Sequence, residues 1–273
     1  VATPADGQSG RLTLRADLRS PLLTLHPGRT ADWKGTAYLH WPDARLDRLA
    51  SPAQLNRWLK LQVTQGQGAL RVWADVDAGQ LMHLTADLAL TGVHAQFARA
   101  PQPLRLDAFS GRVTVDRTGT GWNLGTGPVA FATADGQRWQ HGQLRLQASP
   151  LDGDRPLPGR LEASGIHLGA LHALGAGLPL PDPVHHWLGE LQPQGQIDQL
   201  QLTWTGNESG WSRFKASGRV GGLALAPEAL AASGTSPGSA HPERPGRPGF
   251  RGANIGFELD QSGGQATIDM AHG

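Results

Sequence analysis

The alternation that decides the fold is clearest in the stretch Leu70-Arg71-Val72-Trp73-Ala74-Asp75-Val76. Its even-numbered residues are apolar, and most of its odd-numbered residues are polar. Because successive side chains of a β-strand point to opposite faces, this stretch predicts a strand with one apolar face and one face in water. Two-faced strands of this kind are typical of antiparallel sheets.

The same two-residue period recurs along the whole chain, near residues 12–18, 84–90, 144–148, 200–204 and 255–259. Glycine-containing turn signals separate such runs, among them residues 117–121, 135–136 and 262–264. Because the strands are long and the turns short, the sequence predicts a mainly β meander rather than alternating strands and helices.

Two short helices interrupt the strand pattern. In the first, Ser51 can cap the helix and Pro52 suits its first position; in the second, Asp182 and Pro183 take the same parts. An apolar stripe follows in each, formed by Leu55, Trp58 and Leu59 and by Val184, Trp187, Leu188 and Leu191. We expect each helix to lay its stripe on a sheet, and a further short helix over 166–174.

An internal repeat relates the two halves of the chain. Trp58-Leu59 aligns with Trp187-Leu188, and at the same spacing Gln65-Gly66-Gln67 aligns with Gln194-Gly195-Gln196. A strand that ends in a tryptophan follows each time, at Trp73 and Trp204. So many landmarks in one order indicate one module of a helix and several strands, present twice.

The repeat predicts the organisation of the chain. We expect residues 1–50 to end a preceding β module, residues 51–165 to form the first repeat unit and residues 166–273 to form the second, truncated at its end. The second unit carries an insertion over 231–249 that is rich in Gly, Pro, Ser and Ala. Such a composition buries too little apolar surface to fold, so we expect a flexible loop there.

Composition argues against several classes of function. The 273 residues include no cysteine, which excludes disulfides and thiolate metal ligands. Charged residues make up 17% and the net charge is +1, whereas a nucleic-acid binder needs a basic face. No apolar run approaches the roughly 18 residues that span a bilayer, so we expect any anchoring segment to lie outside the chain.

Catalytic and metal-binding patterns are weak. His185, His186 and Glu190 are the best metal candidate, but a third ligand on the helix face of His186 and Glu190 is missing, and a solvated polar face is the simpler interpretation. The glycine-rich run 119–125 lacks the lysine and the helix of a phosphate loop, so it predicts a hairpin turn. We therefore expect no enzyme activity, no metal and no cofactor, although carboxylates that meet only in space stay open.

Tryptophan is unusually frequent, with nine against one tyrosine. The rings could stack on sugars, lie at a boundary between lipid and water, or fill the core of a sheet. Those in or beside strand patterns are Trp33, Trp41, Trp73, Trp122, Trp139, Trp204 and Trp211.

Several short motifs give the chain a family resemblance. They are Leu178-Pro179-Leu180-Pro181, Trp187–Gly195, Trp204-Thr205-Gly206, Pro248–Ala253 followed by Asp260 and Gly263-Gly264, and Gly66–Trp73. In their order and spacing the chain resembles the YhdP family of AsmA-like proteins. The resemblance covers most of the chain and is thin before residue 30 and within 231–249.

The resemblance implies both a fold and a function. Such proteins are held in the bacterial inner membrane by an N-terminal helix and have a long periplasmic body of repeating β-groove modules, which are elongated, curved antiparallel sheets with short helices between them. They are implicated in phospholipid transport toward the outer membrane. The implied partners are phospholipid acyl chains, the flanking modules of the same full-length protein and other envelope proteins, and no family catalytic residue is implied.

The apolar residues of the alternating strands are the expected lining of the groove. A lipid chain in water costs about 0.8 kcal/mol per methylene, so a carrier across an aqueous gap needs an unbroken apolar track. The same period also suits a closed sandwich, in which a second sheet covers the apolar face. The expected lining residues are Leu12, Leu14, Leu18, Leu70, Val72, Leu84, Leu88, Leu90, Val113, Val115, Leu144, Leu146, Leu200, Leu202, Phe257 and Leu259.

Two other functions stay open from the sequence. A scaffold for outer-membrane proteins would bind partner strands at exposed sheet edges. A carbohydrate-binding β-domain would need tryptophan rings and two carboxylates that converge in one cleft.

Overall fold

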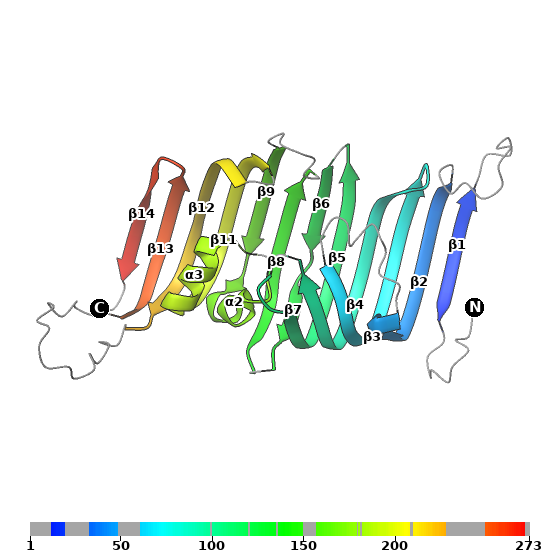
Figure 1. Ribbon diagram of the computed structural model, residues 1–273, viewed down its shortest axis with the longest axis horizontal. Coiled ribbons are helices and arrows are strands. Elements are labelled where there is room, and N and C mark those ends of the chain that lie inside the picture. Colours follow the sequence, from blue (N-terminus) through cyan, green and yellow to red (C-terminus); the bar gives the residue numbers. More distant parts are fainter. Residues whose placement is uncertain are drawn as a thin grey trace, which may run out of the picture.

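A computed structural model gives the fold of the chain. It describes residues 12–19, 33–48, 61–98, 100–119, 121–134, 136–149, 157–178, 180, 182–207, 210–227 and 249–270. Within these residues fourteen strands join one curved sheet, which confirms the mainly β prediction. The sheet is elongated, and its edge strands β1 (Thr13–Arg19) and β14 (Gly263–Met270) lie at opposite ends of the long axis (Figure 1).

The first half of the sheet is a meander of long strands. Each strand pairs antiparallel with the next, from β1 to β6. The strands after β1 are β2 (Lys34–Arg45), β3 (Leu61–Asp77), β4 (Gln80–Phe97), β5 (Leu104–Thr118) and β6 (Gly121–Thr126). Gly119 adopts a left-handed φ of 55° at the β5–β6 connection, which confirms that this glycine-rich run forms a hairpin.

The second half continues the same sheet. Its strands are β7 (Val129–Ala132), β8 (Arg138–Ala148), β9 (Leu157–Ser164), β10 (Ile166–His167), β11 (Gln194–Asn207), β12 (Gly210–Leu225) and β13 (Phe250–Asp260). β7 pairs with β5 and β8, and β10 pairs with β11. The sheet runs on from β9 to β11 past the predicted boundary at residue 165, so the division into repeat units stays a prediction.

Three short helices lie among the described residues: η2 (Leu46–Arg48), α2 (Leu168–Gly175) and α3 (Asp182–Leu191). The last two confirm the helices that the sequence predicts over 166–174 and from Asp182. The helix predicted from Ser51 lies outside the described residues, and so does the insertion predicted over 231–249 except for Gly249. Both α2 and α3 lie on one face of the sheet (Figure 1).

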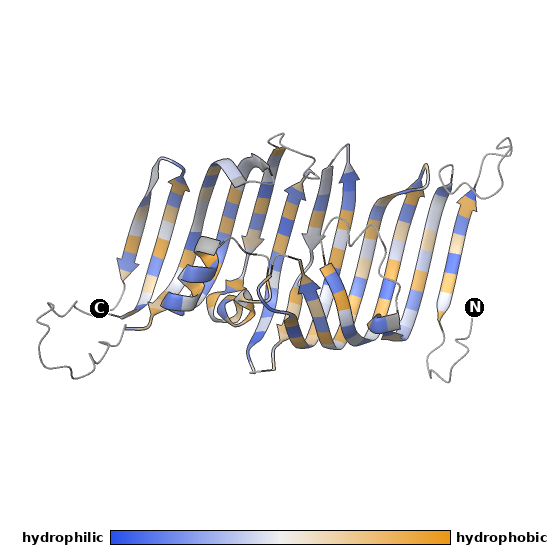
Figure 2. Ribbon diagram, in the orientation of Figure 1, coloured by the Kyte–Doolittle hydropathy of each residue, from blue (hydrophilic) through white to orange (hydrophobic). Residues whose placement is uncertain are grey.

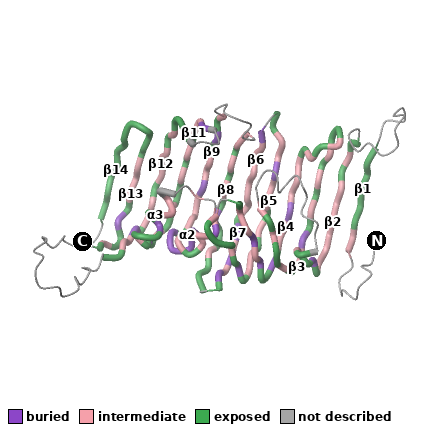
Figure 3. Tube along the Cα trace, viewed as in Figure 1, coloured by how far each residue is buried: buried purple, intermediate pink, exposed green. Residues whose placement is uncertain are grey.

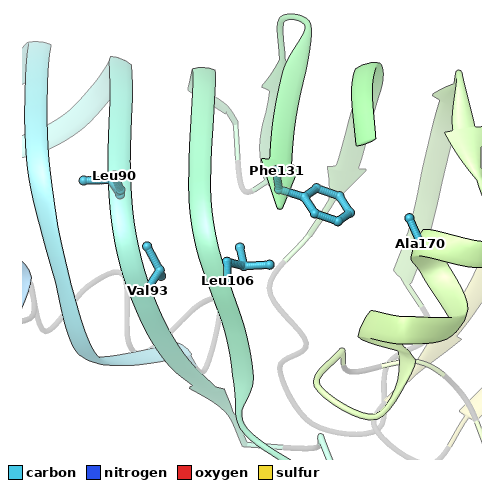
Figure 4. Packing of buried hydrophobic residues seen from close by; sticks show 5 residues of the cluster. All are labelled: Leu90, Val93, Leu106, Phe131 and Ala170. Carbon is cyan, nitrogen blue, oxygen red and sulfur yellow. The ribbon is translucent and has the colours of Figure 1, made fainter. Parts of the chain in front are cut away.

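The buried core lies between α2 and this face of the sheet. One cluster joins β4, β5, β7 and α2, and its residues are Leu90, Val93, Leu106, Phe131 and Ala170 (Figure 4). A second cluster joins α2 to β12 and β13 through Leu168, Leu223 and Ala253. Gly92 has a left-handed φ of 58°, and this local turn of β4 places Val93 on the same face as Leu90.

The packing of α3 corrects one expectation. Leu188 is 2% exposed, but Trp187 of the same predicted stripe is 40% exposed. The main packing partner of α3 is α2, not the sheet: the ring nitrogen Nδ1 of His172 lies 2.8 Å from the carbonyl oxygen of Leu188. Because α2 already occupies the sheet face, α3 buries only the part of its stripe that reaches α2.

Candidate functional site

Strand register aligns apolar residues into one unbroken row across the sheet. Each member lies opposite its neighbour on the next strand, from β1 to β14. The members of this first row are Ala16, Ala37, Ala74, Leu84, Val115, Leu124, Leu146, Leu161, Leu202, Ala216, Leu259 and Gly264. No polar side chain interrupts it.

A second row lies on the same face, two residues along each strand. Its members are Leu14, Leu39, Val72, Ala86, Val113, Thr126, Leu144, Ala163, Leu200, Gly218, Phe257 and Ala266. Thr126 is the one hydroxyl, and its Oγ1 accepts a hydrogen bond of 2.9 Å from the backbone N–H of Leu144. The hydroxyl oxygen of Thr126 is therefore partnered, and every other member of the row is apolar.

The opposite face of the same strands is polar. The row that lies between the two apolar rows in sequence consists of Arg15, Tyr38, Trp73, Thr85, Thr114, Gly125, Arg145, Glu162, Gln201, Ser217, Glu258 and Gln265. Apolar and polar residues accordingly alternate along almost every strand (Figure 2). The sheet thus separates an apolar face from a wet face over its full length.

Charge pairs are concentrated on this polar face. The guanidinium of Arg112 donates two hydrogen bonds to Asp87, of 2.6 Å from Nε and 2.8 Å from an Nη. These bonds hold the pKa of the Asp87 carboxyl below its usual range. His83 contacts Asp116, and Arg160 lies 2.6 Å from Glu162. None of these groups faces the apolar rows.

All of the residues predicted to line a groove lie on the apolar face. Members of the two rows account for most of them, and the others, Leu12, Leu18, Leu70, Leu88 and Leu90, stand an even number of residues from a row member on the same strand. The predicted lining residues do not include Leu39, Leu124 and Leu161, which lie on the same face. An alternating signal surrounds each of them, but Tyr38, Gly125 and Gly159 weaken it.

The apolar face is most buried on strands in the middle of the sheet and most open toward its two ends. Leu90 is 7% exposed and the row members Ala86, Val115 and Ala163 are also buried, whereas Leu14 is 55% and Leu259 is 43% exposed. Leu146 and Leu202 are half-buried. The end strands β1 and β14 are the most exposed (Figure 3). All described strands belong to one sheet, so among them no second sheet closes the face as a sandwich would.

Of the metal candidates on α3, His186 and Glu190 lie close together. His186 Nε2 lies 3.5 Å from Glu190 Oε2 on the exposed side of α3. Groups of three side chains that could hold a metal ion are not found in the described part of the chain. The described helices are too short to cross a membrane.

Tryptophans lie on both faces and in the core. Trp73 packs on Tyr38 on the polar face, with ring centres 5.4 Å apart. Trp139 packs edge-on against Phe131 in the core. Trp204 lies on the apolar face, at the outer side of the first row. The described rings therefore do not converge on one cleft with paired carboxylates, as a carbohydrate site would require.

These features define a class of protein: a long antiparallel sheet whose one face is apolar, partly open and free of interruption from end to end. The family model described as YhdP protein matches residues 1–272, so the chain belongs to the YhdP family. No curated protein and no solved structure matches the chain.

Proposed function

We propose that this chain is one segment of a lipid-conducting wall, whose apolar face carries phospholipid acyl chains through the bacterial periplasm between the inner and the outer membrane. The observation that carries the proposal is the pair of unbroken apolar rows across twelve aligned strands. Membership of the YhdP family supports it. The role is non-catalytic and requires no cofactor.

Elementary energetics favours such a surface for this task. Exposure of a 16-carbon tail to water costs on the order of 12 kcal/mol, at about 0.8 kcal/mol per methylene. Neighbouring strands are about 4.8 Å apart, so the rows extend over roughly 50 Å. A tail that moves from strand to strand along them keeps an apolar contact at every step, so no step carries the full cost of transfer into water.

The two edge strands are suited to bind the flanking modules of the same full-length protein. β1 and β14 each pair on one side only within the described sheet. They run antiparallel to one another in Figure 1, so a further sheet that adds to either edge continues the same alternation. Through such additions the apolar rows extend from module to module.

Native mass spectrometry tests the proposed function. The purified chain is incubated with vesicles of phosphatidylethanolamine and phosphatidylglycerol, recovered by size exclusion, and sprayed under conditions that keep noncovalent complexes. We expect protein ions with one or more phospholipids attached. A chain that recovers no phospholipid, and instead captures outer-membrane proteins from an envelope extract, would favour the scaffold function and contradict the proposal.

A further inference from the structure

A third row on the apolar face contains aromatic residues and one charged residue, unlike most of the first and second rows. Register places it next to the β5–β6 and β11–β12 connections, at the upper edge of the sheet in Figure 1. We call this row the aromatic rim. Its members are Arg117, Trp122, Ala148, Gly159, Trp204 and Phe214.

Arg117 is the one charged residue in the three rows of the apolar face. Its guanidinium carbon lies over the ring of Trp122, 5.8 Å from the ring centre. Among the described residues Arg117 forms no ion pair, whereas the adjacent Asp116 points to the polar face and contacts His83. A half-buried guanidinium without a carboxylate, stacked at the border of an apolar surface, is suited to bind a phosphate.

The tryptophans of the rim mark a boundary between apolar surface and water. The rings of Trp204 and Trp211 stack with centres 5.5 Å apart and an angle of 21° between them. Trp211 is 47% exposed. The ring of Trp204 covers Gly159, where a Cβ atom would lie 2.2 Å from ring carbons. Indole rings favour positions where one part is apolar and another is wet, as at membrane interfaces.

The width of the face fits a lipid whose headgroup lies at this rim. From Arg117 to Gly111, where the side chain of Val129 covers the face, β5 extends for roughly 20 Å at about 3.3 Å per residue. The hydrocarbon of one bilayer leaflet is about 15 Å thick. Acyl chains that start at the rim therefore end before Val129.

We propose that the aromatic rim is the headgroup side of the apolar face, and that Arg117 binds the phosphate of a bound phospholipid. This inference rests on the proposed function and adds an orientation to it. Tails lie across the two inner rows, and headgroups follow one edge of the sheet. The helix-covered side is closed to headgroups.

Paired lipids that differ only in the phosphate-containing headgroup test this assignment. The probes are fluorescent phosphatidylglycerol and fluorescent diacylglycerol with the same chains, both delivered from cyclodextrin. The variants are Arg117→Gln, Arg117→Lys and the control Arg145→Gln, which removes a guanidinium from the polar face. We expect Arg117→Gln to bind phosphatidylglycerol about tenfold more weakly and diacylglycerol unchanged, with most of the loss restored in Arg117→Lys. The control should match the unmodified chain.

Each other outcome has a distinct meaning. If the unmodified chain binds both lipids and Arg117→Gln binds phosphatidylglycerol equally well, the headgroup assignment is wrong and the proposed function stands. An equal loss for both lipids would show that Arg117 supports the structure of the rim, and would also overturn the assignment. Displacement of phosphatidylglycerol by millimolar inorganic phosphate would identify a free-phosphate site instead. If the unmodified chain binds neither lipid, the proposed function itself fails.

Discussion

An aspartate in place of Leu202 would put a carboxylate in the middle of the first apolar row. Leu202 lies between Leu161 on β9 and Ala216 on β12, and it is half-buried. In the lipid-free chain the new carboxylate can reach water, so the fold should lose only about 1 kcal/mol, the range of strand propensity. In the lipid-bound chain the carboxylate faces hydrocarbon.

The magnitude of the effect follows from the contact that is lost. A bound tail loses apolar contact for about three methylenes, at about 0.8 kcal/mol each, and affinity should fall by about 2.4 kcal/mol or roughly fiftyfold. Burial of the carboxylate would add to this loss. The neighbouring Thr203 offers a matched control, because it points to the polar face between Arg160 and Lys215. An aspartate at Thr203 gains two cationic neighbours and should leave lipid binding unchanged.

The assay is equilibrium binding of a fluorescent phospholipid to Leu202→Asp, Thr203→Asp and the unmodified chain. Circular dichroism and thermal unfolding of each variant show whether the sheet is intact. If Leu202→Asp folds and binds phospholipid with the affinity of Thr203→Asp, the two-face reasoning is refuted. An equal loss in both variants would likewise contradict it.

Three further predictions concern stability and association. Because Arg112 lowers the pKa of Asp87, the bond between them stabilises the fold above the usual pKa range of a carboxyl group. This stabilisation is lost as the pH falls through the lowered pKa of Asp87. In an acid titration, Asp87→Asn should therefore lose less stability below about pH 4 than the unmodified chain. Leu188→Ala removes a side chain that is 2% exposed between α3 and α2, and chemical denaturation should show a loss of about 2–4 kcal/mol, or a detached α3 if the sheet is unaffected. Because β1 and β14 are open edges, the isolated chain should self-associate at high concentration, and Ile268→Lys on β14 should reduce this in size exclusion; a monomer at all concentrations would contradict it.

The two-residue period of the sequence predicts most of the fold. The run from Leu70 to Val76 predicts which side chains share a face, and register then joins such runs into rows because antiparallel pairing keeps opposite residues on one face. The order of the strands follows from short connections. For these reasons the sequence predicts the positions of most large apolar residues of this face, although not those of Leu39, Leu124 and Leu161.

Local irregularities could not be predicted in the same way. The pairing of β11 with β12 shifts register between Ile197 and Gln199. The left-handed Gly92 has a similar effect in β4. A glycine permits such a shift but does not require it, so the sequence alone leaves the facing of Val93 undetermined.

The packing of the helices also depends on tertiary structure. The sequence pattern of α3 predicts an apolar stripe but not its packing partner. Because α2 packs on the sheet, the stripe of α3 contacts α2 instead of the sheet. The pattern of α2 is short and apolar on most sides, with Leu168 and Ala170 buried against different clusters. The spacing of the apolar residues therefore does not predict which face of such a helix packs against the sheet.

Site-specific photocrosslinking tests the central claim most directly, that the apolar face and not the polar face carries acyl chains. A benzophenone side chain is placed at Leu146, in the first row, or at its neighbour Gln147, which points to the opposite face. The chain is illuminated with vesicles of phosphatidylethanolamine and phosphatidylglycerol and analysed by mass spectrometry. We expect phospholipid attached at position 146 and little at position 147. Equal labelling at both positions, or labelling at position 147 alone, would contradict it.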